Sequence, residues 1–283
     1  MEKKPRSFWS CISPIMVYYI CRIVASLGVT IVYSLSKLSD IDYNQTYEKV
    51  RDSIINQTTS DLGNIYYVTM LVSAIIAFPF LLRMMRKDES EREVINYKRV
   101  NVYWYVLPVV VGIAAAIAGN NMISMSGIAA NSQGFEEATS ILFSGSVAIQ
   151  VFGIGVLIPI VEEMIFRGLV YRRAGDQFSM MQAMVVSSLI FGLLHGNIVQ
   201  GIYGVVLGFL LCLVYERFHD LKAAILMHMG ANLIVILGSA TNALNFIYSG
   251  QIVFFVVTAM MCLVIIGGVY LLEAFVRAVN ENE

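Results

Sequence analysis

Long apolar runs, each separated from the next by a shorter polar stretch, dominate the pattern along this chain. A helix needs about 20 consecutive apolar residues to cross the hydrocarbon core of a bilayer. Eight runs are long enough, and the fifth and sixth are separated by almost nothing, so they form a tight hairpin. We therefore expect an all-α, polytopic membrane protein with about eight transmembrane helices in a single domain, 1–283. The predicted spans are 11–36, 64–83, 102–123, 146–171, 179–196, 198–216, 222–240 and 252–274.

The composition also indicates that much of the chain is in contact with the lipid bilayer rather than with water. Hydrophobic residues make up 58% of the chain and charged residues only 14%, whereas a soluble domain carries about 25% charged residues. The net charge is −1, and no basic patch with interleaved aromatic residues is present, so we expect no nucleic-acid partner. The first run is longer than the core of a signal peptide, and we interpret it as a retained span.

Positive charge predicts the orientation, because loops on the cytoplasmic side are enriched in Lys and Arg. If the N-terminus is inside, all but four of the 19 Lys and Arg residues fall on the inside. The exceptions are Lys37, Lys49 and Arg51, which fall outside, and Arg22, which lies within the first span. We therefore expect both termini in the cytoplasm.

The fourth span carries three charges inside an apolar helix: Glu162, Glu163 and Arg167. A charge at the bilayer centre costs about 2.5–3.5 kcal/mol on insertion scales, so such residues are expected to be paired or functional. Glu163 and Arg167 are four apart with the acid first, which is the favoured order for an ion pair on one helix face. Glu162 points about 100° away and is free for another role. Pro159 removes a backbone hydrogen bond nearby, so a kink is expected.

Two later spans also carry polar side chains. His195 ends the fifth span, one turn after Phe191, and His228 and Asn232 share one face of the seventh span. Each feature alone is compatible with a buried hydrogen-bonding side chain. Together they supply the parts of a hydrolytic site. A carboxylate can take a proton from water, a histidine can pass it to the leaving amine, and a second histidine with an amide can stabilise an oxyanion.

At these positions the chain resembles the CAAX-protease and bacteriocin-processing family, also called the Abi family, of intramembrane glutamic endopeptidases. Its three motifs occur in order: EExxxR at Glu162–Arg167, FxxxH at Phe191–His195, and HxxxN at His228–Asn232. The resemblance covers about residues 146–240, and the other spans carry none of it beyond hydropathy.

The resemblance implies eight membrane helices around a polar intramembrane cavity. It implies that Glu162 activates water with help from His195, and that His228 and Asn232 form the oxyanion hole. Glu163, Arg167 and Phe191 would be structural or orienting. The implied enzyme needs no cofactor or metal and cleaves a membrane-associated peptide or protein, in peptide maturation or bacteriocin immunity, at a bacterial plasma membrane.

Three other functions remain open from the residues alone. Glu162, His195 and His228 are also a ligand set for a zinc-dependent membrane protease. Intramembrane acids and histidines also build proton-coupled transporters, although we find no internal repeat of the kind many carriers show. A non-catalytic membrane partner could use the same residues for binding.

The depth of the site residues is the weak point of this hypothesis. At 1.5 Å per residue, Glu162 lies about 15 Å from the inner charges, His228 about 9 Å and His195 about 25 Å. Straight helices that start at the membrane surface do not bring these three side chains to one level.

Overall fold

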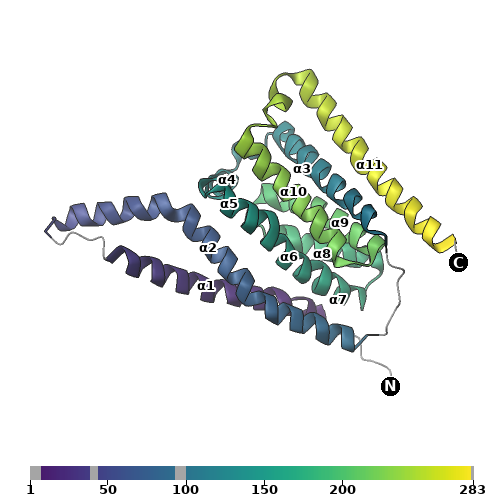
Figure 1. Cartoon of the computed structure of the whole chain (residues 1–283), viewed down its shortest axis with the longest axis horizontal. Coiled ribbons are helices and arrows are strands. Elements are labelled where there is room, and N and C mark those ends of the chain that lie inside the picture. The colour runs from purple at the N-terminus through teal and green to yellow at the C-terminus, as the bar shows by residue number, and fades with distance from the viewer. Residues whose placement is uncertain (1–7, 39–43, 93–99, 282–283) are drawn as a thin grey trace.

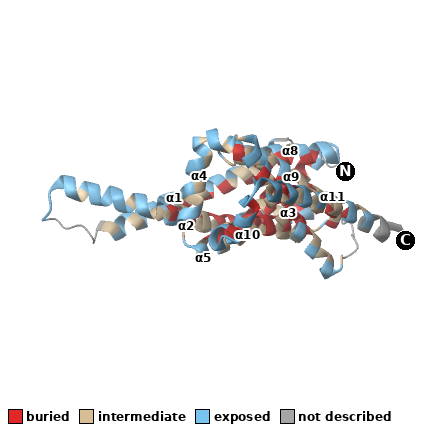
Figure 2. Ribbon diagram, turned by 90° about the horizontal axis from the view of Figure 1, so that it is seen from above, coloured by how far each residue is buried: buried red, intermediate tan, exposed pale blue. Residues whose placement is uncertain are grey.

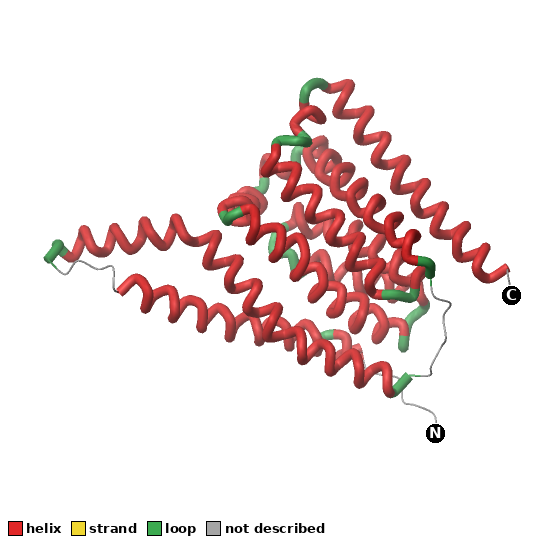
Figure 3. Tube along the Cα trace, viewed as in Figure 1, coloured by secondary structure: helices red, strands yellow, loops and turns green. Residues whose placement is uncertain are grey.

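The computed structural model describes residues 8–38, 44–92 and 100–281, and this part of the chain is helical without any strand (Figures 1 and 3). The main helices are α1 (Ser13–Leu38), α2 (Tyr47–Ser90), α3 (Val106–Ser126), the shorter α8 (Met180–Leu193), α9 (Ile198–Phe218), α10 (Leu221–Thr241) and α11 (Gln251–Glu281). Between α3 and α8 lie α4 (Gln133–Ser144), α5 (Val147–Gln150), η4 (Val151–Leu157), α6 (Ile158–Glu163), η5 (Met164–Tyr171) and α7 (Arg172–Gly175). Short 3₁₀ turns are η1 (Phe8–Cys11), η2 (Val102–Tyr105), η3 (Ala129–Asn131) and η6 (Asn245–Tyr248).

Seven helices within the described residues are long and apolar enough to cross a membrane. One of them is the continuous rod 147–175, made of α5, η4, α6, η5 and α7. The expected all-α polytopic architecture is confirmed. The fifth predicted span, 179–196, is instead the 14-residue helix α8. At 1.5 Å per residue it covers about 21 Å, which is short of the roughly 30 Å hydrocarbon core.

Helix α2 departs from expectation in the other direction. We predicted a span over 64–83 after a polar outer loop, but the helix runs without a break through 44 residues. That length is about 66 Å, twice the thickness of the hydrocarbon core. Its N-terminal part projects with the end of α1 away from the other helices and is largely exposed (Figures 1 and 2).

The helices form two packed groups. Helices α1 and α2 lie side by side against η5 and α6, while α3 packs between α10 and α11 (Figure 1). The start of α1 and the end of α11 lie at the same end of the bundle, as expected for termini on one side of a membrane. Large apolar side chains such as Leu35 on α1 and Leu263 on α11 are exposed, which suits contact with lipid chains.

A layer of polar contacts ties the helices together at that end. The Arg173 guanidinium on α7 donates from Nε to Asp88 Oδ2 at 2.7 Å and from Nη2 to Oδ1 at 3.0 Å. Its Nη1 donates to the Ser10 carbonyl oxygen of η1 at 2.6 Å. Tyr105 also donates to Asp220. The Arg173 bonds hold η1 and the C-terminal end of α2 against α7, so these three elements meet at the same end of the bundle.

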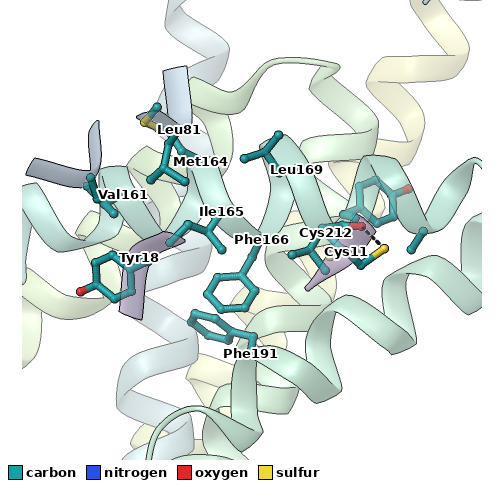
Figure 4. Packing of buried hydrophobic residues seen from close by; sticks show 14 of the residues in the cluster. Cys11, Tyr18, Leu81, Val161, Met164, Ile165, Phe166, Leu169, Phe191 and Cys212 are labelled. Carbon is teal, nitrogen blue, oxygen red and sulfur yellow. Dashed lines mark hydrogen bonds between the residues drawn. The ribbon is translucent and has the colours of Figure 1, made fainter. Parts of the chain in front are cut away.

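Two apolar clusters are buried in the described residues, and the one next to the polar side chains lies where the rod 147–175 crosses α2 and α8. Phe166 and Phe191 meet edge to face, with ring centroids 4.9 Å apart, and Ile165 lies beside them, while Leu169 belongs to the same cluster (Figure 4). Such a pair is worth about 0.5–1.5 kcal/mol beyond its buried area. This packing therefore holds the rod against α8 next to the polar side chains of the site.

Candidate active site

The rod 147–175 is an irregular helix, and its irregularity centres on the two glutamates. The short α-helix α6 ends at Glu163 and is flanked by two π-helical segments, η4 and η5. π-Helix is rare and is found mostly as short insertions at functional sites. The wider turn on either side of α6 sets the directions in which Glu162 and Glu163 point.

Pro159 explains why Asn232 faces this rod. In η4 the Ile158 N–H donates to the Gly153 carbonyl, five residues back. The next donor in that register would be residue 159, which would bond Ile154, but proline has no N–H. The Ile154 carbonyl instead accepts from Asn232 Nδ2 of α10 at 2.9 Å. One amide N–H of Asn232 therefore satisfies a carbonyl that Pro159 leaves without its helical partner.

Glu163 is the centre of a buried charge cluster. Its Oε1 accepts from Arg167 Nη1 at 2.9 Å and from His228 Nδ1 at 2.8 Å, and the Glu163 and Arg167 side chains are both completely buried. Arg167 Nη2 also donates to the Gly208 carbonyl of α9 at 2.8 Å. The ion pair expected from the i, i+4 spacing is present, and it links the rod to α9 and α10.

Glu162 has a different environment, although it is the adjacent residue. Its side chain is 22% exposed, against 0% for Glu163, and it lines a cavity. Its Oε2 lies 3.6 Å from Nε2 of His228, which is too long for a good hydrogen bond. Because His228 binds Glu163 through Nδ1, its Nε2 is the nitrogen that faces Glu162 and the cavity.

His195 lies just after α8, in the turn before α9. Its Nδ1 is 2.8 Å from the Phe191 carbonyl oxygen, which can only accept a hydrogen bond. We infer that Nδ1 carries the proton, so that Nε2 of the neutral ring holds a lone pair. The Phe191 ring contacts both histidines, with centroids 4.7 Å from the His195 ring and 5.8 Å from the His228 ring.

Two glycines of α9 make room for these side chains. A Cβ on Gly204 would lie 3.2 Å from His195 Nδ1, and one on Gly208 would lie 3.3 Å from Arg167 Nη2. Both distances are tighter than ordinary van der Waals contact. The motif residues alone do not reveal these positions, although the spacing G204xxxG208 was a signal of close helix packing.

The four residues expected to carry the chemistry line one cavity of about 650 Å³: Glu162, His195, His228 and Asn232. Phe191 lines it too, while Glu163 and Arg167 lie behind its wall. The depth conflict arose from counting 179–196 as a straight full span. Because α8 is short and ends before His195, the imidazole packs on the same phenylalanine ring as His228.

The cavity also has a wall that the motifs did not predict. Tyr18 and Arg22 from α1 and Tyr66 from α2 line it, although both helices lie outside the motif-bearing region. Arg22 was the available signal, since it is a charge inside an apolar span. Among the described residues, no group of three or more His, Cys, Asp or Glu side chains is arranged to hold a metal ion.

The comparison with known proteins finds similarity in the region that carries the three motifs. Residues 144–234 match the family model described as type II CAAX prenyl endopeptidase Rce1-like. A curated relative is the "Putative membrane peptidase YdiL" of Bacillus subtilis (strain 168). It is 20% identical over 184 residues, which cover 65% of this chain and 75% of the relative. No solved structure matches the chain.

These matches and the helical architecture support a multi-pass membrane protease of CAAX type. More particularly, residues 144–234 are similar to the type II CAAX prenyl endopeptidase Rce1-like family, in agreement with the resemblance to CAAX-protease and bacteriocin-processing proteins that the motifs indicate.

Proposed function

We propose that the protein is an intramembrane glutamic endopeptidase that hydrolyses a peptide bond of a membrane-associated peptide or protein. The observation that carries this proposal is the convergence of Glu162, His195, His228 and Asn232 on one cavity from three separate elements. Polar side chains are costly within an apolar membrane protein, and together these four supply a base, a proton carrier and hydrogen-bond donors.

Glu162 is the proposed general base. It is the partly exposed glutamate of the pair, and no described residue makes a strong hydrogen bond that would occupy its carboxylate. In the proposed reaction it takes one proton from a water molecule while the water oxygen bonds to the scissile carbonyl carbon. The unprotonated Nε2 of His195 orients that water and then relays the proton to the leaving nitrogen, so that the C–N bond breaks and a free amine departs.

His228 and Asn232 are the proposed oxyanion-stabilising residues. Glu163 Oε1 accepts from His228 Nδ1 at 2.8 Å, which leaves Nε2 as the ring nitrogen that faces the cavity. In the proposed reaction Nε2 donates while the ring carries a proton on each nitrogen, and it shares the developing negative charge with the second N–H of Asn232. Removing one oxyanion donor typically costs about 10²–10³-fold in kcat.

Glu163 and Arg167 are the proposed brace. Their buried ion pair holds His228 from behind and ties the rod to the Gly208 carbonyl. Phe191 completes the brace, since its carbonyl sets the His195 tautomer and its ring separates the two histidines. None of the three needs to touch the substrate.

For substrate and setting, we propose a peptide or protein reached from the lipid phase of a bacterial plasma membrane, in peptide maturation or bacteriocin immunity. The match to the type II CAAX prenyl endopeptidase family does not extend the proposal to a prenyl chain. The cavity is lined by apolar residues from α1, α4 and α9, among them Ile15, Phe135 and Tyr203, which suits an apolar segment beside the scissile bond.

Comparative peptidomics of membranes tests this proposal. Membranes from cells that make the wild-type protein are compared with membranes that contain an equal amount of Glu162→Gln. Peptides that appear only with the wild-type protein are the expected result, and they identify the cleaved bond. Equal peptide sets at good coverage would contradict proteolysis.

A second arm separates the alternative chemistries. Cleavage by purified protein is expected to persist in a strong chelator, and its loss with recovery on adding zinc would instead indicate a metalloprotease. Uptake of a solute into liposomes that Glu162→Gln abolishes would indicate a transporter. A cellular phenotype that survives both Glu162→Ala and His195→Ala would indicate a binding role.

A further inference from the structure

The cavity contains a cation that the proposed reaction does not use. Arg22 on α1 lines the same cavity as Glu162 and His195. Its guanidinium carbon lies 5.8 Å from the centroid of the Tyr66 ring. Among the described residues, Arg22 has no carboxylate within 4.0 Å, unlike Arg167 and Arg173, which are both paired. A cation in an apolar span without an acidic partner is expected to have a purpose.

Arg22 and Glu162 lie at similar depths. The hydrogen bond from Arg173 Nη1 to the Ser10 carbonyl places these two residues at one level. Arg22 is 22 − 10 = 12 residues beyond Ser10, and Glu162 is 173 − 162 = 11 residues before Arg173. Both therefore lie about three helical turns from that level, and they line the same cavity. A group bound to Arg22 is therefore positioned beside the proposed base rather than at the membrane surface.

The surroundings of Arg22 leave its hydrogen-bonding edge available. The contact with Tyr66 involves the aromatic face, and a guanidinium stacked on a ring keeps its N–H donors at its edge. Tyr18, four residues earlier on the same helix, lines the cavity on the same side. A planar guanidinium with free N–H donors matches a carboxylate, which it can bind through two parallel hydrogen bonds.

The depth also decides between two sources of negative charge. Lipid phosphates lie in the headgroup region, outside the hydrocarbon core, whereas Arg22 is near the middle of the 26-residue helix α1. A carboxylate that enters the cavity on a peptide reaches this depth together with the bond to be cleaved.

We propose that Arg22 is a specificity-determining residue that binds a carboxylate of the substrate close to the scissile bond. The carboxylate belongs to an acidic side chain or to the free C-terminus of the peptide. This inference rests on the proposed function in one respect, namely that the cavity is the substrate site. In this proposal, helix α1 selects the peptide, although α1 lies outside the family-matched residues 144–234.

A binding experiment on Glu162→Gln protein tests the inference without cleavage. Three pools of N-palmitoylated random pentapeptides are used in the uncharged detergent dodecyl maltoside. One pool ends in a free carboxylate and lacks Asp and Glu, one ends in an amide and contains Glu, and one ends in an amide with Gln in place of Glu. The enrichment of each pool on immobilised protein is measured by mass spectrometry.

The expected result is about tenfold enrichment of one carboxylate-bearing pool over the neutral pool, or about 1.4 kcal/mol, because hydrogen bonds between charged partners are stronger than those between neutral ones. The pool that is enriched identifies the source of the carboxylate. Adding Arg22→Gln should reduce the enrichment to less than about twofold, while Arg22→Lys should retain part of it. Arg86→Gln, which removes an exposed charge near the C-terminal end of α2, is the matched control and should leave the enrichment unchanged.

Three outcomes overturn the inference: no preference for either carboxylate pool, a preference that survives Arg22→Gln, or an Arg22→Gln protein that cleaves acidic and neutral peptides with equally reduced rates. The last outcome would mean that Arg22 acts on Glu162 rather than on the substrate. A carboxylate preference that needs Arg22, in a protein that cleaves no peptide when Glu162 is present, would sustain the binding site and reject the endopeptidase.

Discussion

At the scale of single residues, the site separates two adjacent glutamates by environment. Glu163 is fully buried and bonded to both Arg167 and His228, whereas Glu162 faces the cavity with one long contact. The i, i+4 spacing was sufficient to predict the Glu163–Arg167 pair, because that contact is local to one helix. The bond from Glu163 to His228 was not predictable in this way, since it joins residues 65 positions apart.

Glu163→Gln and Glu162→Gln should therefore differ in stability. The first leaves the Arg167 guanidinium buried without a charge partner, and breaking a buried pair in this way costs about 3–5 kcal/mol. The second removes no strong contact and should leave the unfolding temperature nearly unchanged. Thermal unfolding of both variants in the same detergent checks this. Equal losses of stability would mean that the two glutamates do not divide the roles of brace and base.

At the scale of elements, short and irregular helices position the site. Hydropathy could not reveal that 179–196 contains a helix of only 14 residues, because α8 and its following turn are as apolar as a full span. Nor could it reveal the π-helical segments η4 and η5, which depend on how the rod packs against α2, α8 and α10. Pro159 indicated a disturbance, and the physical consequence is the Ile154 carbonyl bonded by Asn232.

The bond between Asn232 and Ile154 can be separated from the proposed oxyanion role. Asn232→Leu leaves the Ile154 carbonyl without its partner and should cost about 1–3 kcal/mol in unfolding free energy. Pro159→Ala supplies an N–H in the π-helical register and should recover much of that stability in the double variant. Activity should stay low in both, because neither restores an oxyanion donor. Recovery of cleavage together with stability would make Asn232 a purely structural residue.

Gly204 should be needed for the position of His195. A Cβ there would lie 3.2 Å from His195 Nδ1 and 3.1 Å from the Gly192 Cα, so Gly204→Ala should displace the turn between α8 and α9. A displacement of about 1 Å can reduce the rate about 10²-fold. Gly267→Ala on α11 is the matched control, since its Cβ meets nothing within 4 Å. The comparison of kcat for the two alanine variants decides, and similar values would remove the argument from close packing.

At the scale of the whole molecule, the sequence was sufficient to predict the membrane environment, the helical class and the similarity to membrane proteases of CAAX type. It did not determine how far α2 projects, because its polar N-terminal part looked like a loop and its apolar part like a complete span. The structure places the start of α1 and the end of α11 at one end of the bundle (Figure 1). The distribution of Lys and Arg predicts that this end lies at the cytoplasmic face of the membrane.

Cysteine labelling checks the orientation. Single cysteines at Asp52, on the projecting part of α2, and at Glu89, near its C-terminal end, are introduced into a protein whose native cysteines are replaced by serine or alanine. A membrane-impermeant maleimide should label Asp52→Cys in intact cells and Glu89→Cys only after lysis. The opposite pattern would reverse the predicted orientation while leaving the fold unchanged.

The most direct test of the central claim is the rate at which purified wild-type and Glu162→Gln proteins cleave a peptide found by the membrane comparison, measured in a strong chelator. If Glu162 activates water, the wild-type protein retains its rate in chelator, and kcat falls by about 10²–10⁴-fold in a variant of unchanged thermal stability. Cleavage by Glu162→Gln at the wild-type rate would contradict the account.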